Sequence, residues 1–300
     1  MRALFVLTPT EGKRLIGKAV ANMQEVKYAK EYAKILIGHG STNVFVAEEL
    51  LGKESLSKLF PRDTYLSGAI MRGTLCTIPA EEKPPILVLN RGIVEPPAAT
   101  MAEILRDFGP DSVFIKGADA VDHEGNAAVF TAHPEGGTIG WAIGTILARG
   151  IKLIVPVGLE KLIPSIKKAV GLCGQQTFDY CQGLKVGLVP LSGASVVTEI
   201  EALRILAGVD SFHVASGGCS GSEGSVVLVA EGPREAVEKA IGIIEPIKGE
   251  PPLTPPKGEC FSCVVTSPAQ RIGEGTVGIP SSCMYQGKTE NEIPVYLRKK

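Results

Sequence analysis

The sequence has few aromatic residues and no long apolar run. Phe, Trp and Tyr make up 5% of the 300 residues. The most apolar region, residues 139–162, is interrupted by Arg149, Lys152 and Pro156, and a membrane-spanning helix needs about 18 or more apolar residues in succession. The apolar run at the N-terminus is too brief for a signal peptide. We therefore expect a cytoplasmic protein without a membrane partner.

An excess of charge of either sign is also lacking. Lys and Arg number 31 against 32 Asp and Glu, which gives a formal net charge of −1. Such a balance produces no overall field that would attract nucleic acid or an anionic membrane. The one dense basic run, residues 298–300, is typical of a solvated chain end. We expect no nucleic-acid partner.

The cysteines do not indicate a disulfide framework. Seven of them are scattered through a chain long enough to bury a core, which favours reduced thiols. Cys260 and Cys263 have the spacing of metal ligands, but a zinc site needs about four ligands and only Cys283 follows. We predict no metal site and no cofactor.

What the sequence does have is an alternation of short apolar runs and amphipathic segments. The expected strands lie near Ala3–Leu7, Ile35–Ile37, Ile86–Leu89, Val113–Ile115 and Leu153–Val155. The expected helices lie near Gly12–Ala21, Val44–Leu51, Ala98–Phe108, Thr138–Ala148 and Leu159–Ala169. This alternation predicts an α/β fold with a Rossmann-like, mostly parallel sheet and helices on both faces, over residues 1–183. Residues 61–80 indicate an extra hairpin or an irregular excursion.

A different order of elements begins at Leu184. The expected strands are Lys185–Val189, Ser211–Ala215 and Ser225–Ala230, and the expected helices are Val196–Ala207 and Arg234–Ile244. This order favours a small ferredoxin-like α+β domain over residues 184–248. Four prolines between residues 251 and 256 then predict a linker, so that residues 249–300 form a linker and a C-terminal tail. The Gly-rich segment 216–224 is interpreted as a long hairpin connection or a lid.

The loop after the second expected strand reads Gly38-His39-Gly40-Ser41-Thr42-Asn43. In an open parallel sheet the ligand lies beyond the carboxyl ends of the strands. Glycine amides, hydroxyls and a helix N-terminus together can bind a phosphate or a carboxylate. We predict that Gly38, His39, Gly40, Ser41 and Thr42 bind an anion. The alternative is a helix cap made by Ser41 or Thr42.

A second polar cluster covers residues 116–138 and holds two of the four histidines and four carboxylates. Proton transfer near neutral pH needs a group such as a histidine or a buried carboxylate. The catalytic candidates are Lys116, Asp119, Asp122, His133 and Glu135. A structural alternative is an Asx turn from Asp122 to Gly125 and a helix cap before Thr138.

Arg91 leaves the third expected strand, on the side where the other loops are expected. It would add a bidentate contact to the anion. A solvated arginine is the alternative.

Residues 37–50 (IGHGSTNVFVAEEL) and 114–126 (FIKGADAVDHEGN) resemble the superfamily that holds ribose-5-phosphate isomerase, glucosamine-6-phosphate deaminase, sugar-phosphate-sensing repressors and coenzyme A transferases. In the isomerases a Gly-Thr-Gly-Ser-Thr loop grips phosphate and an Asp-Gly-Ala-Asp-Glu motif lines the site. The resemblance implies that residues 38–42 hold the anion and that Gly117, Ala118 and Asp119 match the second motif. By similarity to the repressors, it adds Lys161 after the next strand.

The chain departs from the isomerase pattern at two points. Lys116 stands where the isomerases carry the first Asp of their motif, and no carboxylate follows Gly137 until Glu160. We expect an enzyme that acts on a small phosphorylated or carboxylated metabolite by isomerase-like proton transfer, with homo-oligomers as a further possibility. The alternatives are a non-catalytic sensor of such a metabolite, and an acyl or coenzyme A transferase. The transferase would need Glu95 or Glu135 in the pocket as a nucleophile.

Overall fold

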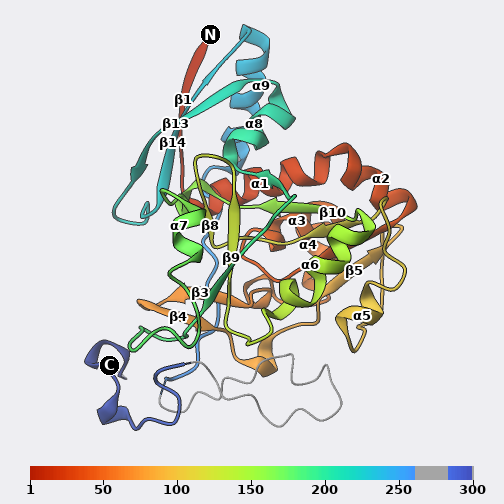
Figure 1. The fold of residues 1–300 in the computed structure, drawn as a ribbon. Coiled ribbons are helices and arrows are strands. Elements are labelled where there is room, and N and C mark those ends of the chain that lie inside the picture. Colours follow the sequence, from red (N-terminus) through yellow and green to blue (C-terminus); the bar gives the residue numbers. More distant parts are fainter. Residues whose placement is uncertain (261–282, 299–300) are drawn as a thin grey trace.

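The computed structural model describes residues 1–260 and 283–298 (Figure 1). A larger body is built around a six-stranded sheet, and a smaller unit stands on one side of it. None of the helices in the described residues is both long and apolar enough to cross a membrane.

The six-stranded sheet confirms the predicted α/β class. In spatial order its strands are β12 (Ser195–Val197), β10 (Lys152–Pro156), β7 (Val113–Ile115), β2 (Lys34–Ile37), β5 (Leu87–Asn90) and β6 (Ile93–Val94). The first four run parallel to one another. β5 runs antiparallel to β2, and β6 runs antiparallel to β5, so the sheet is mixed.

Helices cover both faces of this sheet because its strands are apolar on both sides. Ile35 and Ile37 belong to one core cluster and Leu36, between them, belongs to the other. The first cluster includes residues of α1 (Pro9–Asn22), α2 (Gln24–Tyr32), α3 (Asn43–Leu51) and α4 (Lys53–Ser57). The second includes residues of α5 (Met101–Ile104) and α6 (Gly137–Arg149).

Contrary to the prediction, the first strand, β1 (Arg2–Leu7), is not part of the large sheet. It pairs along its whole length with β14 (Ser225–Glu231), which also pairs with β13 (Asp210–Gly217). Phe5 and Leu7 are buried in the first core cluster, which also includes residues of α8 (Glu199–Ala207) and α9 (Arg234–Ile244), whereas Leu4 is 63% exposed. β1 therefore has one buried face and one exposed face, although residues 3–7 are all apolar.

Residues 184–248 are divided between the two bodies. β11 (Gly187–Pro190) pairs with β9 (Ala127–Thr131), and β9 pairs with β8 (Ala120–Val121), all antiparallel. β12 joins the large sheet, and only the chain from α8 onward builds the smaller unit, together with β1. The expected boundary at residue 184 is thus not where the sheets change.

Local sequence explains two further features. The helix expected over 159–169 is a 3-10 turn (Leu159–Lys161) followed by a short α7 (Ile166–Val170), because Pro164 interrupts the helical hydrogen bonds between them. The hairpin expected within residues 61–80 is present as β3 (Gly68–Met71) and β4 (Thr74–Thr77).

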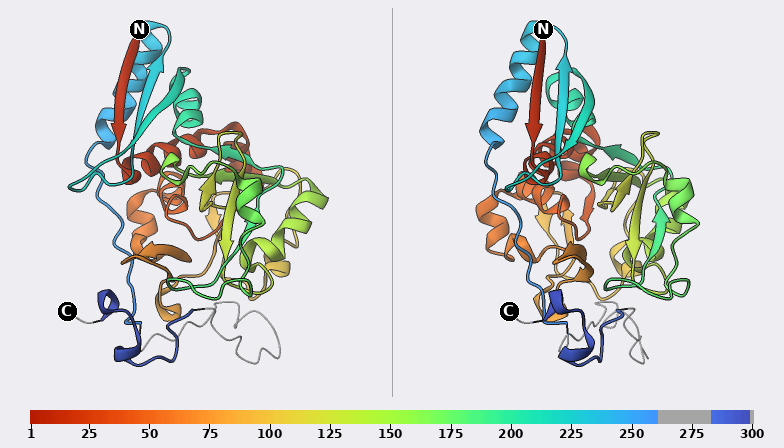
Figure 2. Two further views of the ribbon diagram at one scale, coloured as in Figure 1. Left: turned by 60° about the vertical axis from the view of Figure 1, so that its left-hand side comes forward. Right: turned by 90° about the vertical axis from the view of Figure 1, so that its left-hand side faces the viewer.

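The Pro-rich segment after α9 is bound to the protein rather than free. In both views of Figure 2 it runs from the smaller unit down along the larger body. Glu11 accepts hydrogen bonds from the Lys248 ammonium at 2.6 Å and the Gly249 amide at 2.8 Å. Glu250 pairs with Arg14 at 3.0 Å. We call residues 248–256 the strap.

Candidate functional site

A cavity of about 1810 Å³ lies at the carboxyl ends of β2, β7 and β10. The loops that follow these three parallel strands meet at one edge of the sheet, where the sequence analysis places the ligand. The lining also includes residues of α1, of the β3–β4 hairpin, of β9 and α6, of the strap and of the loop between β13 and β14. The cavity therefore lies between the larger body and the smaller unit.

The loop after β2 uses part of its polar groups internally. The Gly38 amide donates to Ile115 O at 2.9 Å, and the Gly40 amide donates to Tyr65 O at 3.0 Å. Neither amide is available to an anion, so these two backbone groups do not contribute to the predicted anion site. Ser41 lines the cavity, and Thr42 is buried without capping α3. The helix-cap alternative is therefore not what the structure has.

His39 lines the cavity as a neutral side chain. Its Nε2 lies 2.7 Å from Pro84 O, so Nε2 carries the proton and donates it. Burial, together with the positive charges of Lys83 and Lys116, lowers the pKa of His39 to about 3. A histidine with this pKa can position a ligand but does not act as a base that becomes charged near neutral pH.

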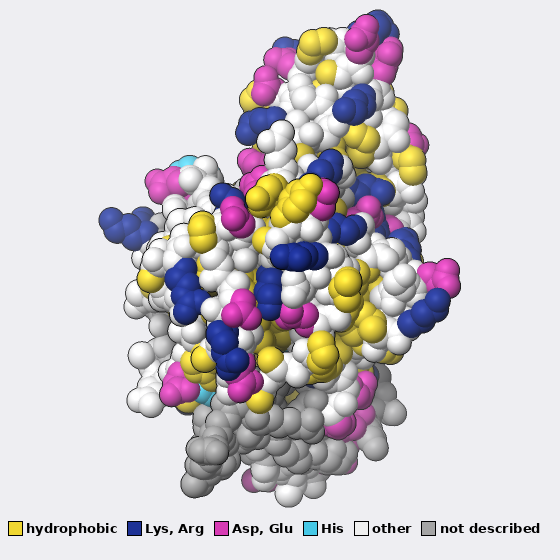
Figure 3. Space-filling model, turned by 90° about the vertical axis from the view of Figure 1, so that its right-hand side faces the viewer, with side chains coloured by type: hydrophobic (Ala, Val, Ile, Leu, Met, Phe, Trp, Pro, Cys, Tyr) yellow, Lys and Arg dark blue, Asp and Glu magenta, His cyan; other side chains and the backbone are white. Residues whose placement is uncertain are grey.

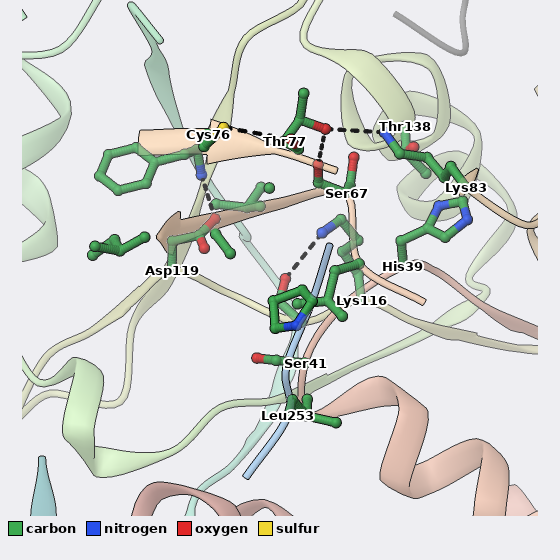
Figure 4. Close-up of a pocket in the computed structure, with 18 of the residues that line it drawn as sticks. His39, Ser41, Ser67, Cys76, Thr77, Lys83, Lys116, Asp119, Thr138 and Leu253 are labelled. Atoms are coloured by element: carbon green, nitrogen blue, oxygen red, sulfur yellow. Dashed lines mark hydrogen bonds between the residues drawn. The ribbon is translucent and has the colours of Figure 1, made fainter. Parts of the chain in front are cut away.

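Four lysines line the cavity, and one of them, Lys13, forms an ion pair with Glu160. The other three are Lys83, Lys116 and Lys161, the first two of which Figure 4 labels. Their ammonium groups donate only to uncharged oxygens, namely Thr77 Oγ1 at 3.2 Å, Gly117 O at 3.2 Å and Ala118 O at 2.7 Å. No carboxylate of the described residues forms an ion pair with any of the three.

Burial makes these positive charges costly. It lowers the pKa of Lys83 to about 8 and also lowers the pKa of Lys116. On the outer face shown in Figure 3, by contrast, acidic and basic side chains alternate and no large patch of one sign gathers.

Asp119 is the predicted catalytic carboxylate that the structure brings to the cavity. Its Oδ2 accepts a hydrogen bond from the Phe130 amide at 2.8 Å. Its other oxygen accepts none from the described residues. The negative charge of Asp119 raises the pKa of Lys116, against the larger effect of burial. Asp119 can therefore hold or take a proton while its orientation stays fixed.

Asp122 does not line the cavity, and the predicted catalytic role is replaced by the structural alternative. Its Oδ1 accepts from the amides of Glu124 and Asn126 at 3.1 and 3.0 Å, and its Oδ2 accepts from the Ile166 amide at 3.0 Å. Burial alone would raise the pKa of Asp122, but these hydrogen bonds outweigh it and lower the pKa. Asp122 closes an Asx turn and fixes the start of α7.

His133 and Glu135 are placed differently. His133 lines the cavity, packs edge-on against Trp141 with ring centroids 4.8 Å apart, and accepts the Glu135 amide at Nδ1. Desolvation lowers the pKa of His133. The Glu135 side chain is exposed and accepts from Trp141 Nε1, so it does not face the cavity as predicted.

Arg91 lies away from the cavity, contrary to its predicted role. The prediction placed the loop after β5 beside the other loops. Because β5 runs antiparallel to β2, that loop lies at the opposite edge of the sheet, where the Arg91 amide donates to Ala33 O. Arg91 is an exposed turn residue with a φ of 49°.

Gly117 and Ala118 have distinct positions. Gly117 lines the cavity, and a Cβ there would lie 3.3 Å from Asn43 Oδ1. Ala118 is buried, and only its carbonyl takes part, as the acceptor for Lys161.

The sequence analysis did not predict six charged residues of the lining: Glu11, Lys13, Lys83, Glu160, Glu223 and Glu250. The charged groups of Lys13 on α1 and Glu160 after β10 lie 2.8 Å apart. Behind them Glu199 is buried and accepts from the Leu159 amide. The carboxylates of Glu199 and Glu160 lie against Gly12 and Gly158, where any Cβ would clash.

We expect the Glu199→Gln variant to lose part of the pH dependence of stability. Burial, then the charge of Glu160, raises the pKa of Glu199 to about 8 from 4.5. The folded state thus keeps a proton that the unfolded chain releases, so stability falls as the pH rises from about 4.5 to about 8. Between about pH 6 and 8 the free energy of unfolding of the wild type should fall by on the order of 2 kcal/mol more than that of the variant. Urea unfolding measures this, with exposed Glu235→Gln as control. Equal pH profiles for all three proteins would refute it.

The metal question concerns the C-terminal cysteines. Cys263 lies outside the described residues. Within residues 1–260 and 283–298, no group of three or more His, Cys, Asp and Glu side chains could hold a metal ion.

No protein-family model, curated protein or solved structure was found to match this chain. The resemblance to the sugar-phosphate isomerase superfamily therefore stays a prediction.

Proposed function

We propose that the cavity binds a small phosphorylated or carboxylated metabolite and catalyses proton transfer on it. The observation that carries the proposal is the set of three half-buried lysines, Lys83, Lys116 and Lys161, without an ion pair to any described carboxylate.

The physical argument is the cost of burying unpaired charge. An ammonium group removed from water is stable only when a charge or hydrogen bonds compensate it. Each lysine here has one uncharged oxygen as its partner, and an ammonium can donate three hydrogen bonds. A phosphate or carboxylate would complete the set, and hydrogen bonds to a charged group contribute about 1.5–3 kcal/mol each.

Proton transfer is assigned to Asp119. One of its oxygens is held by the Phe130 amide, and the other is left for a substrate proton. The Lys116 ammonium and the Asp119 carboxylate line the same cavity and attract each other. His133 Nε2 carries the proton, because Nδ1 accepts the Glu135 amide, and can donate to a substrate oxygen.

The resemblance to the isomerases supports the same proposal, in which the larger body is Rossmann-like and the smaller unit ferredoxin-like. A metabolite sensor is the second candidate, since binding requires only the lysines. A coenzyme A transferase is not favoured. Of the two carboxylates named for it, Glu95 pairs with Lys34 and Glu135 pairs with Trp141, and neither lines the cavity.

The experiment is a thermal-shift screen with sugar phosphates, organic acids and acyl-coenzyme A compounds. A ligand present at about 100 times its Kd stabilises the folded state by about 2.7 kcal/mol. Calorimetry with the best ligand should show affinity about 10- to 100-fold weaker in Lys116→Met, from the loss of one charged hydrogen bond.

Lys152→Met is the matched control, because Lys152 is exposed at the amino end of β10. The proposal fails if no anion binds, or if Lys116→Met and Lys152→Met bind the ligand equally well.

A further inference from the structure

The cavity is larger than a small metabolite requires. Pockets that enclose drug-sized ligands measure about 300–1,000 Å³, and this one measures about 1810 Å³. A sugar phosphate held by the lysines would leave much of this volume empty. The chemical character of the rest of the lining therefore indicates the character of the rest of the ligand.

That remaining lining is mostly apolar. We call one part of it the apolar chamber; its residues are Ile86, Met101, Ile104, Phe130, Ile139 and Trp141. Met101 and Ile139 are buried members of the second core cluster, and Ile86, Ile104 and Trp141 pack against that cluster. The chamber wall is thus anchored to the core of the larger body through α5 and α6.

The chamber begins directly beside the charged groups. Thr138, next to Ile139 in the chain, lines the same cavity as Lys83. Phe130 donates its amide to Asp119 and also lines the cavity. When the anionic group of a ligand binds the lysines, the other end of the ligand can extend into the apolar chamber.

We propose that the ligand is an amphiphile, with a phosphate or carboxylate head bound by the lysines and a hydrocarbon chain in the apolar chamber. This rests on the proposed anion site and adds the class of substrate. Apolar area removed from water contributes about 0.8 kcal/mol per methylene, which corresponds to about a 4-fold gain in affinity.

The test is calorimetry with a series of monoalkyl phosphates, from ethyl through butyl, hexyl and octyl to decyl, each below its micellar concentration. The expected affinity rises by about 4-fold per methylene and then levels off once the chamber is filled. Ethyl phosphate reports on the anion site alone.

Ile104→Ser shortens the apolar wall at a half-buried position, and Ile205→Ser makes the same change at an exposed position on α8 outside the cavity. Ile104→Ser should weaken the binding of octyl phosphate several-fold and leave the binding of ethyl phosphate unchanged. Ile205→Ser should change the affinity for neither ligand.

The outcomes separate the two proposals. If all chain lengths bind equally, or if Ile104→Ser leaves the chain-length dependence intact, the amphiphile inference is overturned while the anion site stands. If no alkyl phosphate binds, or if Lys116→Met binds ethyl phosphate as tightly as the wild type does, the anion site itself is overturned and the inference falls with it.

Discussion

Replacing Arg14 by methionine is expected to lower the free energy of unfolding by about 3–5 kcal/mol. The guanidinium is 2% exposed and pairs with Glu48, with Glu49 at 2.9 Å and with Glu250 at 3.0 Å. It also lies over the Phe45 ring, 4.6 Å from the centroid. Methionine would fill part of the space but would leave the nearly buried carboxylates of Glu48 and Glu250 without their main partner.

Urea unfolding of Arg14→Met measures this loss. Arg234→Met is the control, because Arg234 is largely exposed and forms an ion pair with Glu238 four residues along α9. Exposed pairs of this kind contribute about 0.3–0.5 kcal/mol. Similar losses in the two variants would show that the buried network does not carry the expected energy. Since Glu250 belongs to the strap, Arg14→Met should also weaken ligand binding.

Replacing Asp119 by asparagine is expected to reduce turnover by a factor of about 10² to 10⁴ once a substrate is in hand. The side-chain amide keeps the size of the carboxylate and can still accept from the Phe130 amide, so binding should change little. What is lost is the base. Steady-state kinetics measures kcat and KM, with the exposed Asp111→Asn as control.

The sensor alternative makes the opposite prediction for Asp119→Asn. There is then no turnover to lose, and affinity changes by about the 0.5–1.5 kcal/mol of an ordinary hydrogen bond. An unchanged kcat in Asp119→Asn would show that Asp119 has no role in the proton transfer.

Local sequence was enough to predict the elements that carry the site. The segment from Ile35 to Leu51 reads as a buried strand, a Gly-rich polar loop and an apolar helix, and the structure has β2 and α3 in those places. The same holds for β7 and the Lys116 to Asp119 loop that follows it. The loop after β2 leads to a helix and the loop after β7 leads to β8. Both follow directly from a short apolar run and a Gly-containing polar segment, so a single sequence reveals them.

Pairings between distant segments were not predictable. The direction of β5 depends on its pairing with β2, and this direction decides that Arg91 lies away from the cavity. Lys13 and Glu160 meet only because α1 packs beside β10, which their separation in the sequence does not indicate. Asp122 illustrates a different difficulty. A carboxylate in a polar loop looks the same in sequence whether it faces a ligand or accepts backbone amides, and here it does the latter.

The central claim is that the three half-buried lysines form an anion site, and a crystal structure of the protein soaked with inorganic phosphate or tungstate tests it most directly. The account predicts an anion in the cavity, within about 3 Å of the Nζ atoms of at least two of Lys83, Lys116 and Lys161. An anion held only outside the cavity, with these ammonium groups still bonded to the carbonyls and to Thr77 alone, would contradict it.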